Sequence, residues 1–190
     1  MNVIGLILMG GLNSRMGGEK KALLQYKGRC FYEHVRQAMK DAGVEELYAS
    51  VEKPWDMELG MKQIVDRYEQ IGPLGGIVTA ISEAPGNAAG ILVLPCDLPL
   101  ISPALLSEMI ARFQEVQKPV VLMSEGRPNP LVAIYTIDCL PVLKAQIAEG
   151  NYRATYWTHQ VPHENVVLDP ALKHIVSNIN SMEDYSALVE

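Results

Sequence analysis

Basic residues are scarce in this chain of 190 residues, where 16 lysines and arginines stand against 22 aspartates and glutamates. The formal net charge is -6, and the sequence pI is about 5.3. Proteins that bind nucleic acid without sequence preference depend on an excess of lysine and arginine. The composition therefore argues against nucleic-acid binding as the main function.

Long hydrophobic runs are also missing, since no apolar stretch approaches the roughly 20 residues that a membrane-spanning helix needs. No basic leader or small-residue cleavage pattern precedes the first apolar run. Cysteine is rare, and Cys30, Cys96 and Cys139 lie far apart in the chain. An odd number at such spacing favours neither a disulfide framework nor a C-x-x-C metal site. We expect a cytoplasmic protein without a membrane span.

Hydrophobic residues make up 48% of the chain, enough for one well-filled core, and we expect a single domain over residues 1–190. The apolar pattern predicts strands at 3–9, 47–51, 64–65, 91–94, 119–123, 131–135 and within 161–168, with an extended piece at 175–179. It predicts helices at 31–42, 77–83, 103–113, 138–149 and 152–159, and a last helix capped by Ser181 and Asp184.

Turns separate these elements, namely 27–29, 72–76 and 124–129. The alternation of strands and helices predicts an α/β, Rossmann-like fold with a mostly parallel central sheet flanked by helices. In such folds ligands bind beyond the carboxyl ends of the strands. The glycine-rich loop from residue 10, the stretch 50–52, Asp66 and Asp97 all follow predicted strands, and we expect them to face one crevice.

The glycine-rich loop begins at Gly10 and Gly11 and continues through Arg15 to Lys20 and Lys21. Glycines allow tight turns with exposed N–H groups, and the basic side chains add positive charge, so an anion could bind here. An ordinary turn after a buried strand is the structural alternative. The loop is neither a Walker A motif nor a dinucleotide fingerprint, because G-x-x-x-x-G-K-[ST] and G-x-G-x-x-G are both absent. With a carboxylate from Asp97, it could hold a nucleoside triphosphate and magnesium.

The loop sequence G-G-L-N-S-R-M-G-G-E-K-K resembles the signature of the molybdenum cofactor guanylyltransferase family of nucleotidyltransferases. Matching stretches follow in order over nearly the whole chain: G-P-L-G-G-I at 72–77, L-P-C-D-L-P at 94–99, R-P-N-P-L-V-A-I-Y at 127–135, G-N-Y-R-A at 150–154 and N-I-N-S-M-E-D at 178–184. The resemblance implies transfer of GMP from GTP to the terminal phosphate of molybdopterin, with release of pyrophosphate and with Mg²⁺ as cofactor. It also implies protein partners that deliver the cofactor and accept the product.

Site residues carried over from the resemblance fall into three groups. Arg15, Lys21 and Asp97 match catalytic positions, with Asp97 the magnesium ligand. The nucleotide-binding positions are Leu8, Met9, Gly10, Gly11, Lys21, Ser50, Asp66, Gly72 and Asp97. Arg153, Asn178 and Asn180 match positions that shape the pterin site.

Some residues depart from the family pattern. Met9 replaces an alanine, while Ser50 and Glu52 replace asparagines, and Ser50 is too short to repeat every asparagine contact. The neighbouring Lys20 and Lys21 leave open which lysine contacts the triphosphate, and the spacing favours Lys21. Alternatives are a related enzyme that uses CTP or another phosphorylated acceptor, and a module that binds nucleotide or cofactor without catalysis.

Other candidate residues have simpler interpretations. His159 and His163 are four residues apart, but Pro162 between them breaks a helix and argues against a metal site. Cys96 next to Asp97 is expected to be a packing residue and not a nucleophile. Of Trp55 and Trp157, we expect one to lie in the core.

Overall fold

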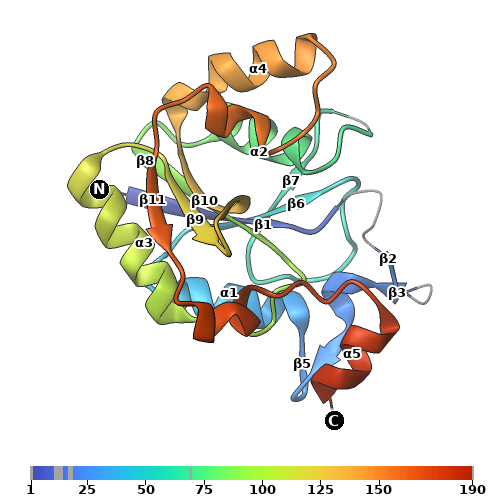
Figure 1. Ribbon diagram of the computed structural model, residues 1–190. Coiled ribbons are helices and arrows are strands. Elements are labelled where there is room, and N and C mark those ends of the chain that lie inside the picture. The colour runs from blue at the N-terminus through green and yellow to red at the C-terminus, as the bar shows by residue number, and fades with distance from the viewer. Residues whose placement is uncertain (1, 11–14, 17–18, 69, 190) are drawn as a thin grey trace.

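A computed structural model describes residues 2–10, 15–16, 19–68 and 70–189 of the chain. A seven-stranded sheet in the order β11-β9-β10-β8-β1-β6-β7 forms its centre (Figure 1). The strands of this sheet are β1 (Asn2–Leu8), β6 (Leu47–Val51), β7 (Lys62–Val65), β8 (Ala88–Pro95), β9 (Val120–Ser124), β10 (Arg127–Thr136) and β11 (Glu164–Val167). Two small hairpins stand apart from it, β2 (Arg15–Met16) with β3 (Glu19–Lys20), and β4 (Gln25–Tyr26) with β5 (Arg29–Cys30).

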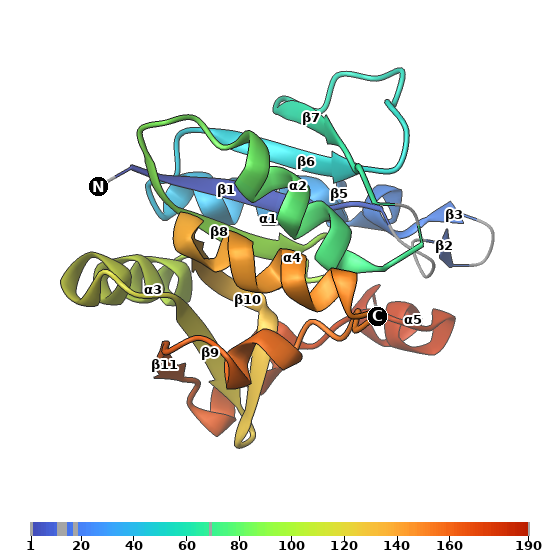
Figure 2. The same ribbon diagram turned by 90° about the horizontal axis from the view of Figure 1, so that it is seen from above.

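Five α-helices lie among the described residues, α1 (Phe31–Asp41), α2 (Pro73–Glu83), α3 (Pro103–Val116), α4 (Leu140–Ala148) and α5 (Met182–Val189). Short 3₁₀ helices are η1 (Lys21–Leu23), η2 (Ile137–Cys139), η3 (Tyr156–His159) and η4 (Pro170–Val176). Helices α1 and α3 cover one face of the sheet, and α2 and α4 cover the other (Figures 1 and 2). None of the helices in the described ranges has the length and apolar character that a bilayer crossing requires.

The sheet is mostly parallel, as the alternation of elements predicts. Strand β1 pairs in parallel with β6 and β8, and β6–β7 and β9–β11 are also parallel pairs. Strand β10 alone among these seven runs antiparallel to its neighbours, β8 and β9. The predicted α/β fold with flanking helices is confirmed.

Successive residues of the central strands point into two separate cores, because side chains alternate between the faces of a sheet. Ile7 and Leu94 belong to the core under α1 and α3, whereas Leu8 and Val93 belong to the core under α2 and α4. Both faces of β1 are therefore buried, which explains its nearly continuous apolar sequence. The rigid sheet fixes where the residues at its strand ends lie.

The predicted turn at 72–76 is wrong, because Pro73 to Gly76 form the first turn of α2. Proline is tolerated at the first helical position, where its missing N–H has no helical partner. The two glycines have a packing role: a Cβ on Gly75 would lie 2.9 Å from Oδ1 of Asp66, and one on Gly76 would overlap the Ser50 hydroxyl. The glycines therefore let α2 approach the ends of β6 and β7.

The predicted turn at 124–129 is also too long. Glu125 and Gly126 alone form the turn, with φ values of 51° and 73°, and β10 begins at Arg127. The register of the β9–β10 pair shifts between Asn129 and Ala133. Pro130 lies in that stretch and has no N–H to donate to a ladder, so an irregularity there is the expected accommodation.

The C-terminal part departs from expectation at two places. The helix predicted at 152–159 is reduced to the 3₁₀ helix η3, Tyr156–His159. Residues 175–176 belong to the 3₁₀ helix η4 and not to an extended piece. The capping of α5 is confirmed, since the Asp184 N–H donates to Ser181 Oγ at 3.0 Å and the Ser181 N–H donates to Asp184 Oδ2 at 2.8 Å. The edge strand within 161–168 is confirmed as β11, and the turn near Gly28 joins β4 to β5.

Candidate active site

Carboxyl ends of four neighbouring strands meet at one edge of the sheet. Backbone hydrogen bonds join them beyond the ladders: Met9 N–H donates to Ser50 O (3.0 Å), Cys96 N–H to Leu8 O (3.2 Å) and Asp66 N–H to Val51 O (2.9 Å). Met9 and Gly10 at the start of the glycine loop, Ser50, Asp66 and Asp97 therefore lie at the same edge of the sheet. That they face one crevice stays a prediction.

A buried ion pair lies at this edge. Nζ of Lys21 is 3.5 Å from Oδ2 of Asp97, and the two residues are only 5% and 8% exposed. Asp97 follows β8, while Lys21 begins η1, directly after β3. Burial raises the pKa of the Asp97 carboxyl, and the Lys21 ammonium and a hydrogen bond from Asn178 act in the opposite direction. The ammonium thus favours the ionised carboxylate in a poorly solvated place.

Two asparagines from the C-terminal part complete this cluster. Asn178 Nδ2 donates to Asp97 Oδ1 at 3.1 Å, and Lys21 Nζ donates to Asn180 Oδ1 at 2.6 Å. Between them, the N–H of Ile179 donates to the Asp97 carbonyl oxygen at 3.1 Å. The structure therefore brings four of the predicted site residues, from three distant segments, into one hydrogen-bonded group.

Asp66 occupies a second polar position, at the end of β7. Its Oδ1 accepts hydrogen bonds from the Thr79 hydroxyl at 3.2 Å and from the Tyr68 N–H at 3.3 Å. Burial raises the pKa of the Asp66 carboxyl, and these hydrogen bonds partly oppose that effect. Thr79 is fully buried on α2 and also accepts the N–H of Arg67 at 3.1 Å. The carboxyl is thus held in one place against the start of α2.

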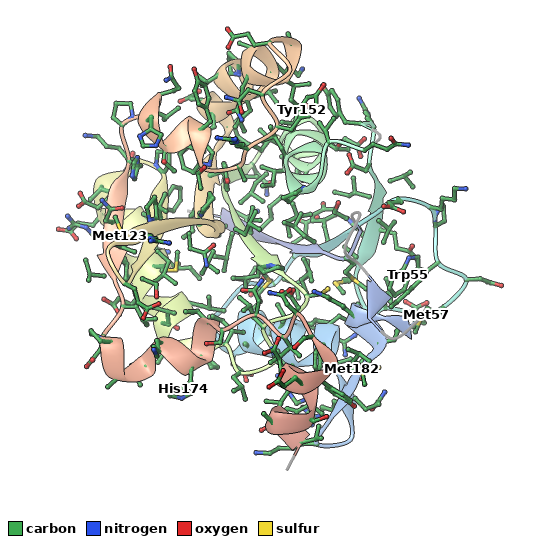
Figure 3. The ribbon with its side chains drawn as sticks, turned by 45° about the vertical axis from the view of Figure 1, so that its right-hand side comes forward. Trp55, Met57, Met123, Tyr152, His174 and Met182 are labelled. Atoms are coloured by element: carbon green, nitrogen blue, oxygen red, sulfur yellow. The ribbon has the colours of Figure 1, made fainter. Side chains whose placement is uncertain are left out.

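A pocket of about 170 Å³ opens beside the glycine loop. Its lining residues are Met9, Gly10, Lys20, Glu52, Lys53, Pro54 and Trp55. The Lys20 ammonium lies 3.7 Å from the centroid of the Trp55 ring, a cation–π contact. Gln63 on β7 holds the Trp55 backbone from both sides, accepting its N–H at 2.8 Å and donating to its carbonyl at 3.0 Å. Figure 3 shows Trp55 with Met57 on this side of the molecule.

The side chains of Lys20 and Lys21 thus lie in different surroundings, although the two residues are neighbours in the chain. Lys20 lies over Trp55 at the pocket, whereas Lys21 contacts Asp97 and Asn180. The alternation of side chains around the end of β3 separates the two ammonium groups. The structure places Lys21, and not Lys20, beside the Asp97 carboxylate. Which of the two lysines contacts the triphosphate stays a prediction.

Arg153 is not part of the cluster around Asp97. It is exposed in the loop after α4, where its carbonyl accepts from Gln146 Nε2 at 2.9 Å and its N–H donates to Asn151 Oδ1 at 3.2 Å. Figure 3 shows its neighbour Tyr152 beside α4, at the opposite end of the view from Met182, which follows the asparagine segment. In the described part of the chain, no hydrogen bond or ion pair connects Arg153 with Asp97 or Asn178.

Gly72, Arg15 and Gly11 are three further predicted site residues. Gly72 has φ 69° and precedes α2, a conformation that side chains rarely adopt. Arg15 lies in β2, where its backbone pairs with Lys20. Gly11 lies outside the described residues.

Residues that the sequence analysis missed support the site from behind. Thr79 holds Asp66, Gln63 holds the Trp55 loop, and Gln146 holds Arg153. Gln146 is 2% exposed. It lies three residues after Leu143 on the same buried face of α4, and that spacing in the sequence is the signal that could have singled it out. No comparable signal marks the other two.

Cys96 and the tryptophans bear out the simpler interpretations. Cys96 is buried, and burial raises the pKa of its thiol to about 12, so the thiolate that a nucleophile needs is suppressed. Trp157 lies in the core, where its Nε1 donates to the Tyr135 hydroxyl at 2.8 Å. His163 packs edge-on against the Trp157 ring, and among the described residues no group of three or more His, Cys, Asp or Glu could hold a metal by itself.

Solved structures of other proteins share this fold. The chain superposes on molybdopterin-guanine dinucleotide biosynthesis protein A from Archaeoglobus fulgidus with a TM-score of 0.79, at 18% identity over 100% of this chain and 97% of the other. A Mycobacterium tuberculosis protein crystallised with manganese gives a TM-score of 0.69, at 16% identity over 100% and 98% of the two chains. The fold is that of a nucleotidyltransferase.

Sequence similarity is more specific. Residues 5–163 match the MobA-like NTP transferase domain, and the chain belongs to that family. It is 34% identical over 182 residues to a protein of Flavobacterium johnsoniae named as a probable molybdenum cofactor guanylyltransferase, covering 96% of this chain and 94% of the relative. The resemblance that the motifs indicate is thereby confirmed.

Proposed function

We propose that this protein transfers GMP from GTP to the terminal phosphate of molybdopterin, forming the guanine dinucleotide cofactor and pyrophosphate. The family supports the reaction class, and one observation in the structure carries the proposal further. Lys21 and Asp97 form a buried pair of opposite charges at the strand edge where the glycine loop begins. That pair combines a cation for phosphate oxygens with a carboxylate for a metal ion.

Asp97 is suited to a divalent cation that is shared with the substrate. Mg²⁺ is commonly held by one or two carboxylates together with substrate phosphates and water, and not by an all-protein cage. Asp97 is one buried carboxylate with hard oxygen atoms, and no group of three or more His, Cys, Asp or Glu that could hold a metal occurs in the described ranges, which fits that pattern. When bound, the ion would neutralise phosphate charge at the reacting centre. Asp97, the carboxylate of the buried pair, would hold it.

The chain's own residues would act by position and charge. An oxygen of the pterin's terminal phosphate forms a bond to the α-phosphorus of GTP while the bond from that phosphorus to the β-phosphate oxygen breaks, and pyrophosphate leaves with the bonding electrons. Lys21 would stabilise the charge that builds up on the leaving group, with Arg15 assisting from the loop. No protein nucleophile is needed, in keeping with the suppressed thiolate of Cys96.

The nucleoside would lie along the ends of β1, β6 and β7. Gly10 is exposed just beyond the end of β1, where a Cβ would lie 3.2 Å from Glu52, and Ser50 and Asp66 face the first turn of α2. An ionised or protonated carboxyl at Asp66 can bond to ribose hydroxyls or base N–H groups. The free thiols Cys30, Cys96 and Cys139 are compatible with a reducing cytoplasm as the place of reaction.

The test is to incubate the protein with Mg²⁺, molybdopterin cofactor and each nucleoside triphosphate in turn, and to measure pyrophosphate. We expect release with GTP, and loss of release in Asp97→Asn, which keeps the side-chain shape and removes the charge. Release with CTP and not GTP would overturn the guanine assignment. Binding of a nucleotide without release, at any acceptor concentration, would instead favour a non-catalytic binding module.

A further inference from the structure

A segment near the C-terminus crosses the carboxyl end of β8 and contacts both members of the ion pair, Lys21 and Asp97. We call residues 177–181 the asparagine strap. Asn178, Ile179 and Asn180 contact, in order, the Asp97 carboxylate, the Asp97 carbonyl and the Lys21 ammonium. Three consecutive residues thus bond to the proposed catalytic pair.

The two asparagine side chains have complementary tasks. Asn178 uses an amide hydrogen on Oδ1 of Asp97, the oxygen that Lys21 leaves open, so the two carboxylate oxygens have separate partners. Asn180 uses its amide oxygen on Lys21. An ammonium has three hydrogens, and with Asp97 and Asn180 as neighbours one remains available for a phosphate oxygen. Both bonds fix the direction of a charged group.

Contacts with Phe31 and with residues of α5 hold the strap in place. Ile179 is buried with Phe31 in a small apolar cluster, and the Phe31 ring lies edge-on to Tyr185 of α5 at 5.9 Å between centroids. The Tyr185 hydroxyl donates to the Gln25 carbonyl at 2.8 Å, and Asp184 accepts the N–H of Asn180 at 3.0 Å. Figure 1 shows α5 beside the β4–β5 hairpin. The asparagines therefore sit on a supported backbone.

We propose that Asn178 and Asn180 are positioning residues, which hold Asp97 and Lys21 in the geometry that binds the metal–nucleotide complex. The resemblance alone places them at the pterin. The proposal rests on the proposed function only in assigning metal and triphosphate to Asp97 and Lys21. Partners that orient a metal ligand are worth about 10- to 100-fold in metal affinity when removed.

The experiment measures binding without any acceptor, so that a contact to the pterin cannot contribute. Isothermal titration calorimetry of GTP with Mn²⁺ should give a dissociation constant about tenfold higher in Asn178→Ala and in Asn180→Ala than in the unchanged protein. Asn165→Ala is the matched control, because it makes the same change at an exposed position on the edge strand β11. Asn180→Asp keeps an oxygen for Lys21 and should restore most of the affinity.

Unchanged GTP–Mn²⁺ affinity in both alanine variants, with only the KM for the acceptor raised, would overturn the proposal and make the asparagines acceptor ligands. Thermal unfolding of each variant checks the fold. Because Asn180 is exposed, Asn180→Ala tests the proposal even if Asn178→Ala does not fold. If the unchanged protein binds CTP–Mn²⁺ in place of GTP–Mn²⁺, the guanine assignment fails while the same comparison, made with CTP, still decides the role of the strap.

Discussion

The ammonium of Lys21 lies 3.5 Å from the carboxylate of Asp97, and both groups are almost completely removed from solvent. Charges in such a place lose much of their hydration, so each depends on the other. The pair therefore contributes to the fold as well as to the proposed chemistry. The two contributions can be separated by measurement.

Removal of Lys21 should destabilise the protein because Asp97 is then buried without a counter-ion. We expect Lys21→Met to lower the free energy of unfolding by about 3–5 kcal/mol at pH 7. The double variant Lys21→Met with Asp97→Asn should lose clearly less than the sum of the two single changes. Urea unfolding of all four proteins gives the coupling, and additive losses would show that the pair is not coupled.

Lys20 and Lys21 should differ in their effect on turnover. Lys21→Met should lower kcat by about 100-fold or more, as loss of a charge at the reacting phosphates does. Lys20→Met, at the Trp55 pocket, should change kcat less than tenfold. Steady-state pyrophosphate release with GTP measures both. The reverse order would assign the triphosphate contact to Lys20.

Thr79 should control the titration of Asp66. Burial raises the pKa of Asp66 in the folded state. Between the pKa of the unfolded chain and that of the folded protein, the folded protein therefore keeps a proton on Asp66 that the unfolded chain has lost. The stability that Asp66 contributes is present at low pH and is lost as the pH rises through the folded pKa. Thr79→Val removes a hydrogen bond that opposes the shift. It should cost about 1–2 kcal/mol at pH 7 and less at pH 4. Urea unfolding at the two pH values tests this, and an equal loss at both would contradict it.

Gly76 should resist substitution although it lies in a helix. Alanine is normally the better helix former, but its Cβ here would overlap the Ser50 hydroxyl. We expect Gly76→Ala to lower the free energy of unfolding by about 1–3 kcal/mol through overpacking. Gly86→Ala is the control, because nothing lies within 4 Å of its Cβ position. Adding Ser50→Ala to Gly76→Ala should recover part of the loss, and no recovery would mean that the clash is with other atoms.

Much of the fold follows from local sequence pattern, and the predictions failed where contacts with other segments decide the conformation. The continuous apolar run of β1 and the capping residues Ser181 and Asp184 are local signals, and both predictions are confirmed. The start of α2 was missed because proline and two glycines read as a turn, whereas close packing against Ser50 and Asp66 decides the conformation. Likewise, the β9–β10 pairing extends regular structure to Arg127 through contacts that local pattern does not record.

The candidate site also has a part that the sequence predicts and a part that it does not. The strand-end rule placed Asp66 and Asp97 at one edge without any structural knowledge. It could not place Asn178 against Asp97 or Asn180 against Lys21, because those contacts join segments that are far apart in the chain. Gln63 and Thr79 were missed because their roles arise from one neighbour each, Trp55 and Asp66, met only after folding.

The asparagine strap has a consequence for biosynthesis. During translation, the sheet strands that carry Lys21 and Asp97 to the site are all made before Asn178 and Asn180 leave the ribosome. A nascent chain can therefore assemble the central strands while the ion pair still lacks its last two partners. A chain cut just before residue 178 would keep most of the core and lose both asparagine contacts to the ion pair, so we expect it to bind the metal–nucleotide complex more weakly.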